Sequence, residues 1–147
     1  MSAETPREVV DAFIDISCQG LGGEPVDVFA VLDDQVEYIR HGIKPIEAKC
    51  KSLAEVRERV FPPEVLAAIM PRPGFGMYPL EYIEEGNRVV VIMKGRGANI
   101  YGVPYDNTYF FLFEVRNGKI VRVVEDLDAS LSFRCFYHVH LEETRRD

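Results

Sequence analysis

The sequence predicts an α+β protein in which helices near the N-terminus pack on one face of a curved antiparallel sheet. Apolar residues at helical spacing occupy much of the first 70 positions, and four long runs of β-branched and aromatic residues follow from position 77. The pair Asn117-Gly118, between the last two runs, is a strong signal for a hairpin turn. With 147 residues, 47% of them apolar, we expect one domain over 1–147 in which 129–147 is a C-terminal extension.

Capping signals mark two helix starts. Thr5 can cap a helix that has a proline at its first position and Glu8 in its first turn, which predicts a helix over about 6–18. Ser52 and the glutamate three residues later form a second capping-box pattern, which predicts that another helix begins there. The other elements expected before the long strands are a short helix over 25–34, a strand over 35–39 and a helical region over 53–70 that prolines 62 and 63 interrupt.

Four strands are expected over 78–83, 88–98, 105–116 and 119–127. A two-residue turn at Asn117-Gly118 predicts the pairs Val115 with Ile120, Leu112 with Val123, and Phe110 with Glu125. One face of the hairpin would carry Phe110, Leu112, Val121, Val123, Glu125 and Leu127. The other would carry Tyr109, Phe111, Phe113, Val115, Ile120 and Val124. Because both faces are apolar, we expect helices on one side and a second subunit on the other, in a homodimer packed through the sheet.

Composition excludes several classes of partner. The 17 basic and 24 acidic residues give a formal charge of −7 and a pI near 5.0, which disfavours nucleic acid and anionic membranes. Three cysteines without CxxC spacing indicate neither a disulfide framework nor a zinc site. No apolar run approaches the ~20 residues of a membrane helix, and no signal pattern opens the chain. We therefore expect a cytoplasmic protein with no nucleic-acid or membrane partner and no cofactor.

The order of the elements to about residue 128, with FEVRNGKIVRVVEDLD at 113–128, resembles the nuclear-transport-factor-2-like (NTF2-like) superfamily. The resemblance implies a cone-shaped, cystatin-like fold, shared by SnoaL-like polyketide cyclases, ketosteroid isomerases, limonene epoxide hydrolases and phenazine-biosynthesis A/B proteins. Segments 95–97 and 105–110 are most similar to the phenazine A/B proteins, whose acid for an imine-forming condensation corresponds to Glu125. SnoaL-like cyclases place a catalytic aspartate at a comparable point of the last strand.

Other functional positions depart from these relatives. Steroid isomerases use a tyrosine and two aspartic acids, where this chain has Phe13, Tyr38 and either Phe110 or Leu112, so their mechanism is not expected. The arginine and paired aspartates of the epoxide hydrolases are not evident. Val124 also stands where the phenazine A/B pattern has an arginine. The resemblance therefore indicates the fold more strongly than the reaction.

Glu125 is the principal catalytic candidate. A carboxyl group among apolar neighbours is costly to ionise, so its pKa should rise toward the range useful for a general acid or base. Tyr38 and His41, at the end of the first predicted strand, could orient a ligand or pass a proton. The alternatives are that Glu125 lies solvated at a rim or hydrogen-bonded to Tyr38 or His41, and that His41 is a surface residue.

Apolar and aromatic side chains suit a ring-shaped ligand, although core packing alone would produce the same set. The ligand-binding candidates are Phe13, Phe61, Tyr78, Tyr82, Phe110, Leu112, Val123 and Leu127. His138 and His140 have a spacing at which imidazoles can share a metal, but no third ligand is placed, so no metal site is expected. Phe133, Phe136, Tyr137, Val139 and Leu141 are expected to cover the dimer sheet or close the cavity.

These observations favour a cofactor-independent isomerase, cyclase or condensation enzyme that uses acid/base chemistry on an apolar ring compound or secondary metabolite. Glu125 would be the acid or base, assisted by Tyr38 and His41. The alternative is a non-catalytic ligand-binding or accessory dimerisation module built on the same cavity. Fold alone does not decide between them, because unrelated functions share it.

Overall fold

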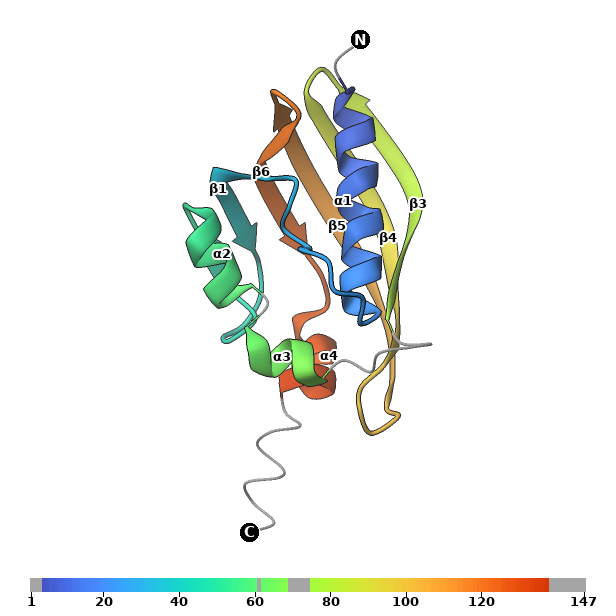
Figure 1. The fold of residues 1–147 in the computed structure, drawn as a ribbon. Helices are drawn as coiled ribbons and strands as arrows, with labels where there is room; N and C mark the ends of the chain where they lie inside the picture. Colours follow the sequence, from blue (N-terminus) through green and yellow to red (C-terminus); the bar gives the residue numbers. More distant parts are fainter. Residues whose placement is uncertain (1–3, 61, 69–74, 138–147) are drawn as a thin grey trace.

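The computed structural model describes residues 4–60, 62–68 and 75–137. Six strands form one curved, open sheet in the order β2-β1-β6-β5-β4-β3 (Figure 1). The elements are α1 (Pro6–Leu21), β1 (Leu32–Arg40), β2 (Ala48–Cys50), α2 (Leu53–Arg59), α3 (Pro63–Ala68), β3 (Gly76–Glu85), β4 (Arg88–Ala98), β5 (Pro104–Arg116), β6 (Lys119–Asp126), α4 (Ala129–Ser132) and the π-helix η1 (Phe133–Tyr137).

The expected α+β arrangement is confirmed, but one strand pair corrects the expectation of a wholly antiparallel sheet. β1 runs parallel to β6, with Tyr38 beside Val123 and Arg40 beside Glu125. Parallel neighbours require a long connection, and here the whole segment from β2 to β5 separates the two strands. As a result, the C-terminal ends of β1 and β6 lie at the same end of the sheet, where they bring together side chains that are far apart in the sequence.

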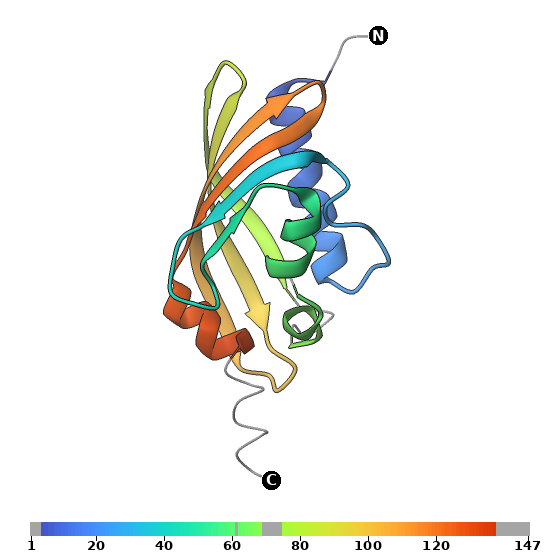
Figure 2. The same cartoon turned by 90° about the vertical axis from the view of Figure 1, so that its left-hand side faces the viewer.

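Helix α1 lies along one face of the sheet, which we call the inner face (Figures 1 and 2). Its predicted capping box is present, because the Thr5 hydroxyl accepts from the Glu8 amide at 3.2 Å and the Glu8 carboxylate accepts from the Thr5 amide at 2.7 Å. The helix contributes the buried side chains Val9, Val10 and Phe13 to the core. In the part of the chain that the structure describes, no helix is long and apolar enough to cross a membrane.

The second helical region is divided as predicted, since α2 ends at Arg59 and α3 begins at Pro63. The prediction of a short helix over 25–34 is wrong, because this segment forms turns and β1 already begins at Leu32. The carboxylates of Asp27 and Asp33 accept hydrogen bonds from backbone amides two residues ahead, at 3.0 and 2.9 Å. Such local bonds stabilise turns in competition with helix.

The β5–β6 hairpin turns where predicted and has the expected first pair, Val115 with Ile120. Glu114 then pairs with Arg122, so Val121 is an extra residue that forms a bulge. Beyond the bulge the register is shifted by one, which makes two of the predicted pairs wrong. The observed pairs are Phe113 with Val123, Leu112 with Val124, Phe111 with Glu125 and Phe110 with Asp126.

The shift exchanges the faces expected for several β5 side chains. Phe111 and Phe113 are buried on the inner face, whereas Phe110 lies on the outer face with 52% of its surface exposed. Leu112 shares the outer face and is half-buried. Because side chains alternate along a strand, one bulge residue is sufficient to reverse the assignment.

Candidate functional site

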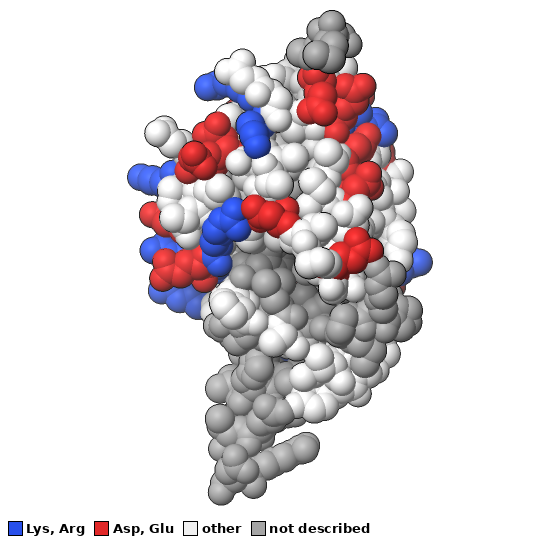
Figure 3. Space-filling model, in the orientation of Figure 1, with Lys and Arg blue, Asp and Glu red and all other residues white. Residues whose placement is uncertain are grey.

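A cavity of about 60 Å³ lies between α1 and the inner face of the sheet, at the end where α3, α4 and η1 pack. Its wall is mostly apolar and is contributed by α1, β1, α3, strands β3 to β6, α4 and η1. Because the wall is mostly apolar, its few polar groups stand in apolar surroundings. On the face shown in Figure 3, the charged side chains gather over the upper part, and the described atoms lower down belong mostly to uncharged residues.

Glu125 and Tyr38 meet in this wall. The Tyr38 hydroxyl donates to Glu125 Oε2 at 2.7 Å, and the two side chains are 3% and 2% exposed. Burial raises the pKa of Glu125 above its ordinary value, and the Arg40 charge and the Tyr38 hydrogen bond only partly oppose this. Burial also holds the pKa of Tyr38 well above its usual range. Glu125 is thus a buried carboxyl group that binds a proton more tightly than a free glutamate.

Arg40 supplies a buried positive charge to the same wall. It is 4% exposed and donates from Nε to the Ile46 carbonyl at 2.7 Å and from Nη1 to the Val60 carbonyl at 2.9 Å. Its Nη2 donates to the Tyr137 hydroxyl at 3.2 Å. Arg40 therefore joins β1, the segment before β2, the end of α2 and η1 around the cavity.

A second polar group comes from β5. The hydroxyls of Tyr105 and Tyr109 are in hydrogen-bond contact, and Asn107 Nδ2 donates to the Tyr105 hydroxyl at 2.9 Å. Asn107 also makes two hydrogen bonds with the backbone of Asp128. Its Nδ2 donates to the Asp128 carbonyl at 3.0 Å, and its Oδ1 accepts from the Asp128 amide at 3.2 Å. Burial raises the pKa of both tyrosines. Tyr109 reaches the cavity wall, so the network connects the cavity with the start of α4.

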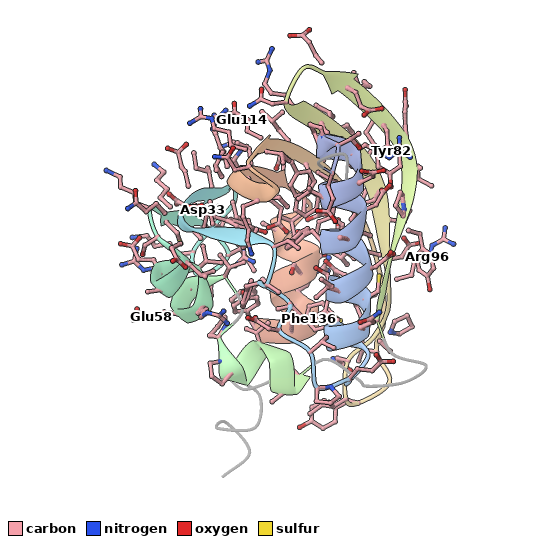
Figure 4. The ribbon with its side chains drawn as sticks, turned by 45° about the horizontal axis from the view of Figure 1, so that its top comes forward. Asp33, Glu58, Tyr82, Arg96, Glu114 and Phe136 are labelled. Atoms are coloured by element: carbon pink, nitrogen blue, oxygen red, sulfur yellow. The ribbon has the colours of Figure 1, made fainter. Side chains whose placement is uncertain are left out.

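The C-terminal segment closes one end of the cavity. Phe136 and Tyr137, on η1, line it, and the Phe136 ring packs against Tyr105 with centroids 4.6 Å apart. Figure 4 shows Phe136 near α3 and the lower end of α1. Of the two roles expected for this segment, its described part therefore closes the cavity. Val139 and Leu141 lie outside the described residues, as do His138 and His140.

Some of the predicted site residues lie at the cavity and others do not. Tyr38, Glu125, Phe13 and Leu127 line the cavity, whereas Val123 is buried in the core beside it. Phe61 lies outside the described residues. His41 has an exposed side chain, and its backbone amide donates to the Glu125 carbonyl at 3.0 Å.

The remaining candidates lie away from the cavity. Tyr82 donates to Asp11 at 2.7 Å and stands at the opposite end of the sheet from Phe136 (Figure 4). Tyr78 is 54% exposed. Phe110 and Leu112 are on the outer face because of the bulge. The aromatic positions that sequence analysis failed to select for the cavity are Phe75, Tyr109 and Phe111.

Arg40 was also missed, together with Ser132 and the methionines Met77 and Met93. In the sequence, Arg40 resembles an exposed residue at a strand end, and no local pattern marks it as buried. The only available signal was that Arg40 follows Tyr38 by two residues on a strand, which places both side chains on the same face of the sheet. No three His, Cys, Asp or Glu side chains group as possible metal ligands within the described ranges.

The arrangement can exchange a proton with a bound molecule. Glu125 in its protonated form is a donor, and in its ionised form it is a base supported by the Tyr38 hydroxyl. Arg40 and Tyr109 can stabilise negative charge that develops on a ligand oxygen. Tight aromatic packing around them, such as the stacked rings of Phe111 and Phe113 at 5.3 Å, limits access of water.

No protein-family model matches the chain, and no curated protein matches it. Several solved structures are similar to it. An NTF2-like protein of unknown function from Burkholderia pseudomallei K96243 has a TM-score of 0.70 at 19% identity, over 90% of this chain and 98% of its own. A protein described as a putative SnoaL-like polyketide cyclase from Jannaschia sp. CCS1 has a TM-score of 0.67 at 18% identity, over 89% of this chain and 90% of its own. TerC co-crystallised with polyporic acid has a TM-score of 0.68 at 17% identity, over 90% of this chain and 98% of its own. The chain has the NTF2-like fold.

Proposed function

We propose that this chain with the NTF2-like fold is a cofactor-independent enzyme that performs proton transfer on a ring compound, as an isomerase, cyclase or condensation enzyme. Glu125 exchanges the proton and Tyr38 holds its carboxyl group in place. The single observation that carries the proposal is the carboxyl group of Glu125, 3% exposed, in the wall of an aromatic cavity. The Tyr38 hydrogen bond of 2.7 Å, one of the alternatives that the sequence left open for Glu125, here holds this carboxyl group in place. Perturbed ionisable groups in such positions are concentrated at functional sites.

The wider set of similar structures supports a ligand of this class. TerC was crystallised with polyporic acid, and another similar structure is described as a SnoaL-like polyketide cyclase. A cavity of about 60 Å³ is smaller than the roughly 150 Å³ that accepts a benzene molecule. Binding a ring therefore requires side chains to move. The unbranched Met77 and Met93 in the wall are suited to such repacking.

His41 has a weaker claim to the assisting role, since its side chain is exposed and only its backbone bonds to Glu125. We retain it as a residue at the edge of the site that can accept a proton from solvent. The three cysteines are free thiols, which is consistent with the cytoplasmic location that we propose.

The test begins with native mass spectrometry of freshly purified protein and identification of any small molecule released on denaturation. Turnover of that compound, or of a panel of polyketide-type ring compounds, is then compared in Glu125→Gln and Glu114→Gln. Glu114 lies on the outer face of the neighbouring strand and serves as the matched control. We expect Glu125→Gln to lose at least about 100-fold in turnover and the control to lose little. Equal activity of Glu125→Gln and wild type would overturn the proposal.

Ligand binding without turnover across the panel would instead favour the alternative, a non-catalytic binding module. The cavity supports that function as well, because its apolar wall with few polar groups is typical of binding sites in general. The two functions differ in the Glu125→Gln variant, which would retain binding in both and lose turnover only in an enzyme.

We further propose a homodimer that packs through the outer face of the sheet. Tyr78, Leu80, Ile83 and Phe110 expose more than half of their surface there or along the β3 edge. The flanking charges are already paired within the chain, as in Lys94 with Asp106 at 3.2 Å and Arg122 with Glu114 at 3.2 Å. A face of this kind can meet its own copy without opposing unpaired like charges.

Analytical ultracentrifugation of Phe110→Asp tests the dimer. We expect wild type to sediment as a dimer and Phe110→Asp as a folded monomer, because the substitution places a charge in the apolar contact. Glu85→Asp, at the exposed end of β3, is the control and should remain dimeric. A monomeric wild type at micromolar concentration would refute the interface.

A further inference from the structure

The guanidinium of Arg40 is a buried charge that makes no ion pair with a carboxylate in the described part of the chain. Its three acceptors are the carbonyls of Ile46 and Val60 and the hydroxyl of Tyr137, which are all neutral. Within the described residues, no Asp or Glu oxygen lies within ion-pair distance of it. A charge that is 4% exposed and paired only with dipoles is expensive unless something else neutralises it.

Glu125 is the nearest candidate to neutralise Arg40, but it is already engaged elsewhere. The two residues are partners in the β1–β6 register, yet Glu125 accepts from Tyr38 and lies beyond ion-pair distance of Arg40, so the Arg40 charge acts on it only at longer range, where it lowers the pKa of Glu125. Burial also favours the protonated, neutral form of Glu125. When Glu125 carries its proton, the cavity wall contains one positive charge and no negative charge.

We infer that the cavity binds its ring compound as an anion, with a carboxylate, phenolate or enolate oxygen placed against Arg40. This inference rests on the proposed function and specifies the substrate class of the same site. Arg40 lines the cavity and uses three of its five N–H groups on the acceptors named above, so two have no acceptor among the described residues. Hydrogen bonds between charged groups in a low-dielectric site are strong, so the charge of the ligand should dominate its selection.

The position of the other polar groups agrees with an anionic ligand. Tyr109 lines the same wall with its hydroxyl in hydrogen-bond contact with that of Tyr105, and the protonated Glu125 adds a donor. Phe111 and Phe136 supply apolar surface for the ring. The acidic group would thus be held by donors while the ring packs on aromatic side chains. A neutral ring of the same shape would leave the Arg40 charge uncompensated whenever Glu125 carries its proton.

Benzoate and benzamide form the simplest matched probes, because they have the same ring and nearly the same shape but differ in charge. We expect isothermal titration calorimetry to give at least about tenfold tighter binding of benzoate to the wild-type protein. The preference should fall to about twofold or less in Arg40→Met and be partly retained in Arg40→Lys. Arg57→Met is the control, since Arg57 is exposed and paired with Asp27, and it should preserve the wild-type preference.

Three outcomes separate this inference from the proposed function. Equal binding of the two probes would overturn the charge preference but leave a cavity that binds rings. Binding of neither probe would overturn both. If Arg40→Met fails to fold, transferred NOEs from benzoate to the Phe136 ring replace it, and their absence with measurable binding would show that the anion binds elsewhere and overturn the inference.

Discussion

Replacing Tyr38 by phenylalanine removes one hydroxyl and almost no volume, so it isolates the hydrogen bond to Glu125. The bond is 2.7 Å long and both side chains are nearly inaccessible to water. A bond of this kind to a carboxyl group contributes about 1–3 kcal/mol, with the larger values when the acceptor is charged. We therefore expect Tyr38→Phe to lower the free energy of unfolding by about 1 kcal/mol at acidic pH and by up to about 3 kcal/mol at alkaline pH.

The pH dependence follows from the direction of the Glu125 shift. Its pKa in the folded protein lies above the ordinary value of 4.5, so the folded state binds the proton more tightly than the unfolded chain. Stability from this group is fully present below about pH 4.5 and is lost as pH rises through the folded-state pKa. The Tyr38 hydrogen bond lowers that pKa and limits the loss. Without it, the loss continues to a higher pH.

Urea denaturation at several pH values measures these effects, with Tyr78→Phe as control because Tyr78 is 54% exposed. Combining Tyr38→Phe with Glu125→Gln completes a double-mutant cycle, for which we expect a coupling of about 0.5–3 kcal/mol. The reasoning would be refuted if Tyr38→Phe cost no more than Tyr78→Phe, or if the two substitutions in the cycle were additive at all pH values.

Three further predictions concern stability and register. Glu125→Gln should gain stability relative to wild type as pH rises, by about 1.4 kcal/mol for each unit by which burial raises the pKa, and a difference independent of pH would contradict this. Phe111→Ala should cost about 3–5 kcal/mol in urea denaturation, whereas Phe110→Ala should cost under about 1 kcal/mol in the monomer; the reverse order would show that the faces are misassigned. Deleting the bulge residue Val121 should leave a cooperative thermal transition, because regular pairing remains, while deleting Val124 should abolish it by reversing the faces beyond that point.

Local signals predicted much of the fold. The capping box at Thr5 and Glu8 begins α1, the prolines at 62 and 63 divide α2 from α3, and the Asn117-Gly118 pair joins the last two strands. In each case the cause lies within a few residues of chain, as a capping bond, a missing amide or a backbone conformation with positive φ. The sequence therefore determines these elements without help from distant contacts.

The candidate site shows where local information ends. Glu125 was predicted as a site residue because of its apolar neighbours, and Tyr38 because it lies near the end of the first strand; the structure brings the two into contact. The bulge at Val121 left no recognisable signal, because β6 carries apolar residues on both faces and a shift of one position leaves the sequence pattern looking the same. Phe110 was therefore assigned to the cavity in place of Phe111.

Arg40 depends entirely on tertiary structure. Its acceptors come from Ile46, Val60 and Tyr137, which are 6, 20 and 97 residues away in the chain. Only the parallel pairing of β1 with β6 and the packing of η1 bury this charge beside Glu125. Local sequence patterns were sufficient to predict α1, the divided α2–α3 region, five of the six strands and the site residues Glu125 and Tyr38. Which other side chains face the cavity, and that a buried charge stands among them, follows from tertiary structure, because burial and pairing depend on contacts between distant segments.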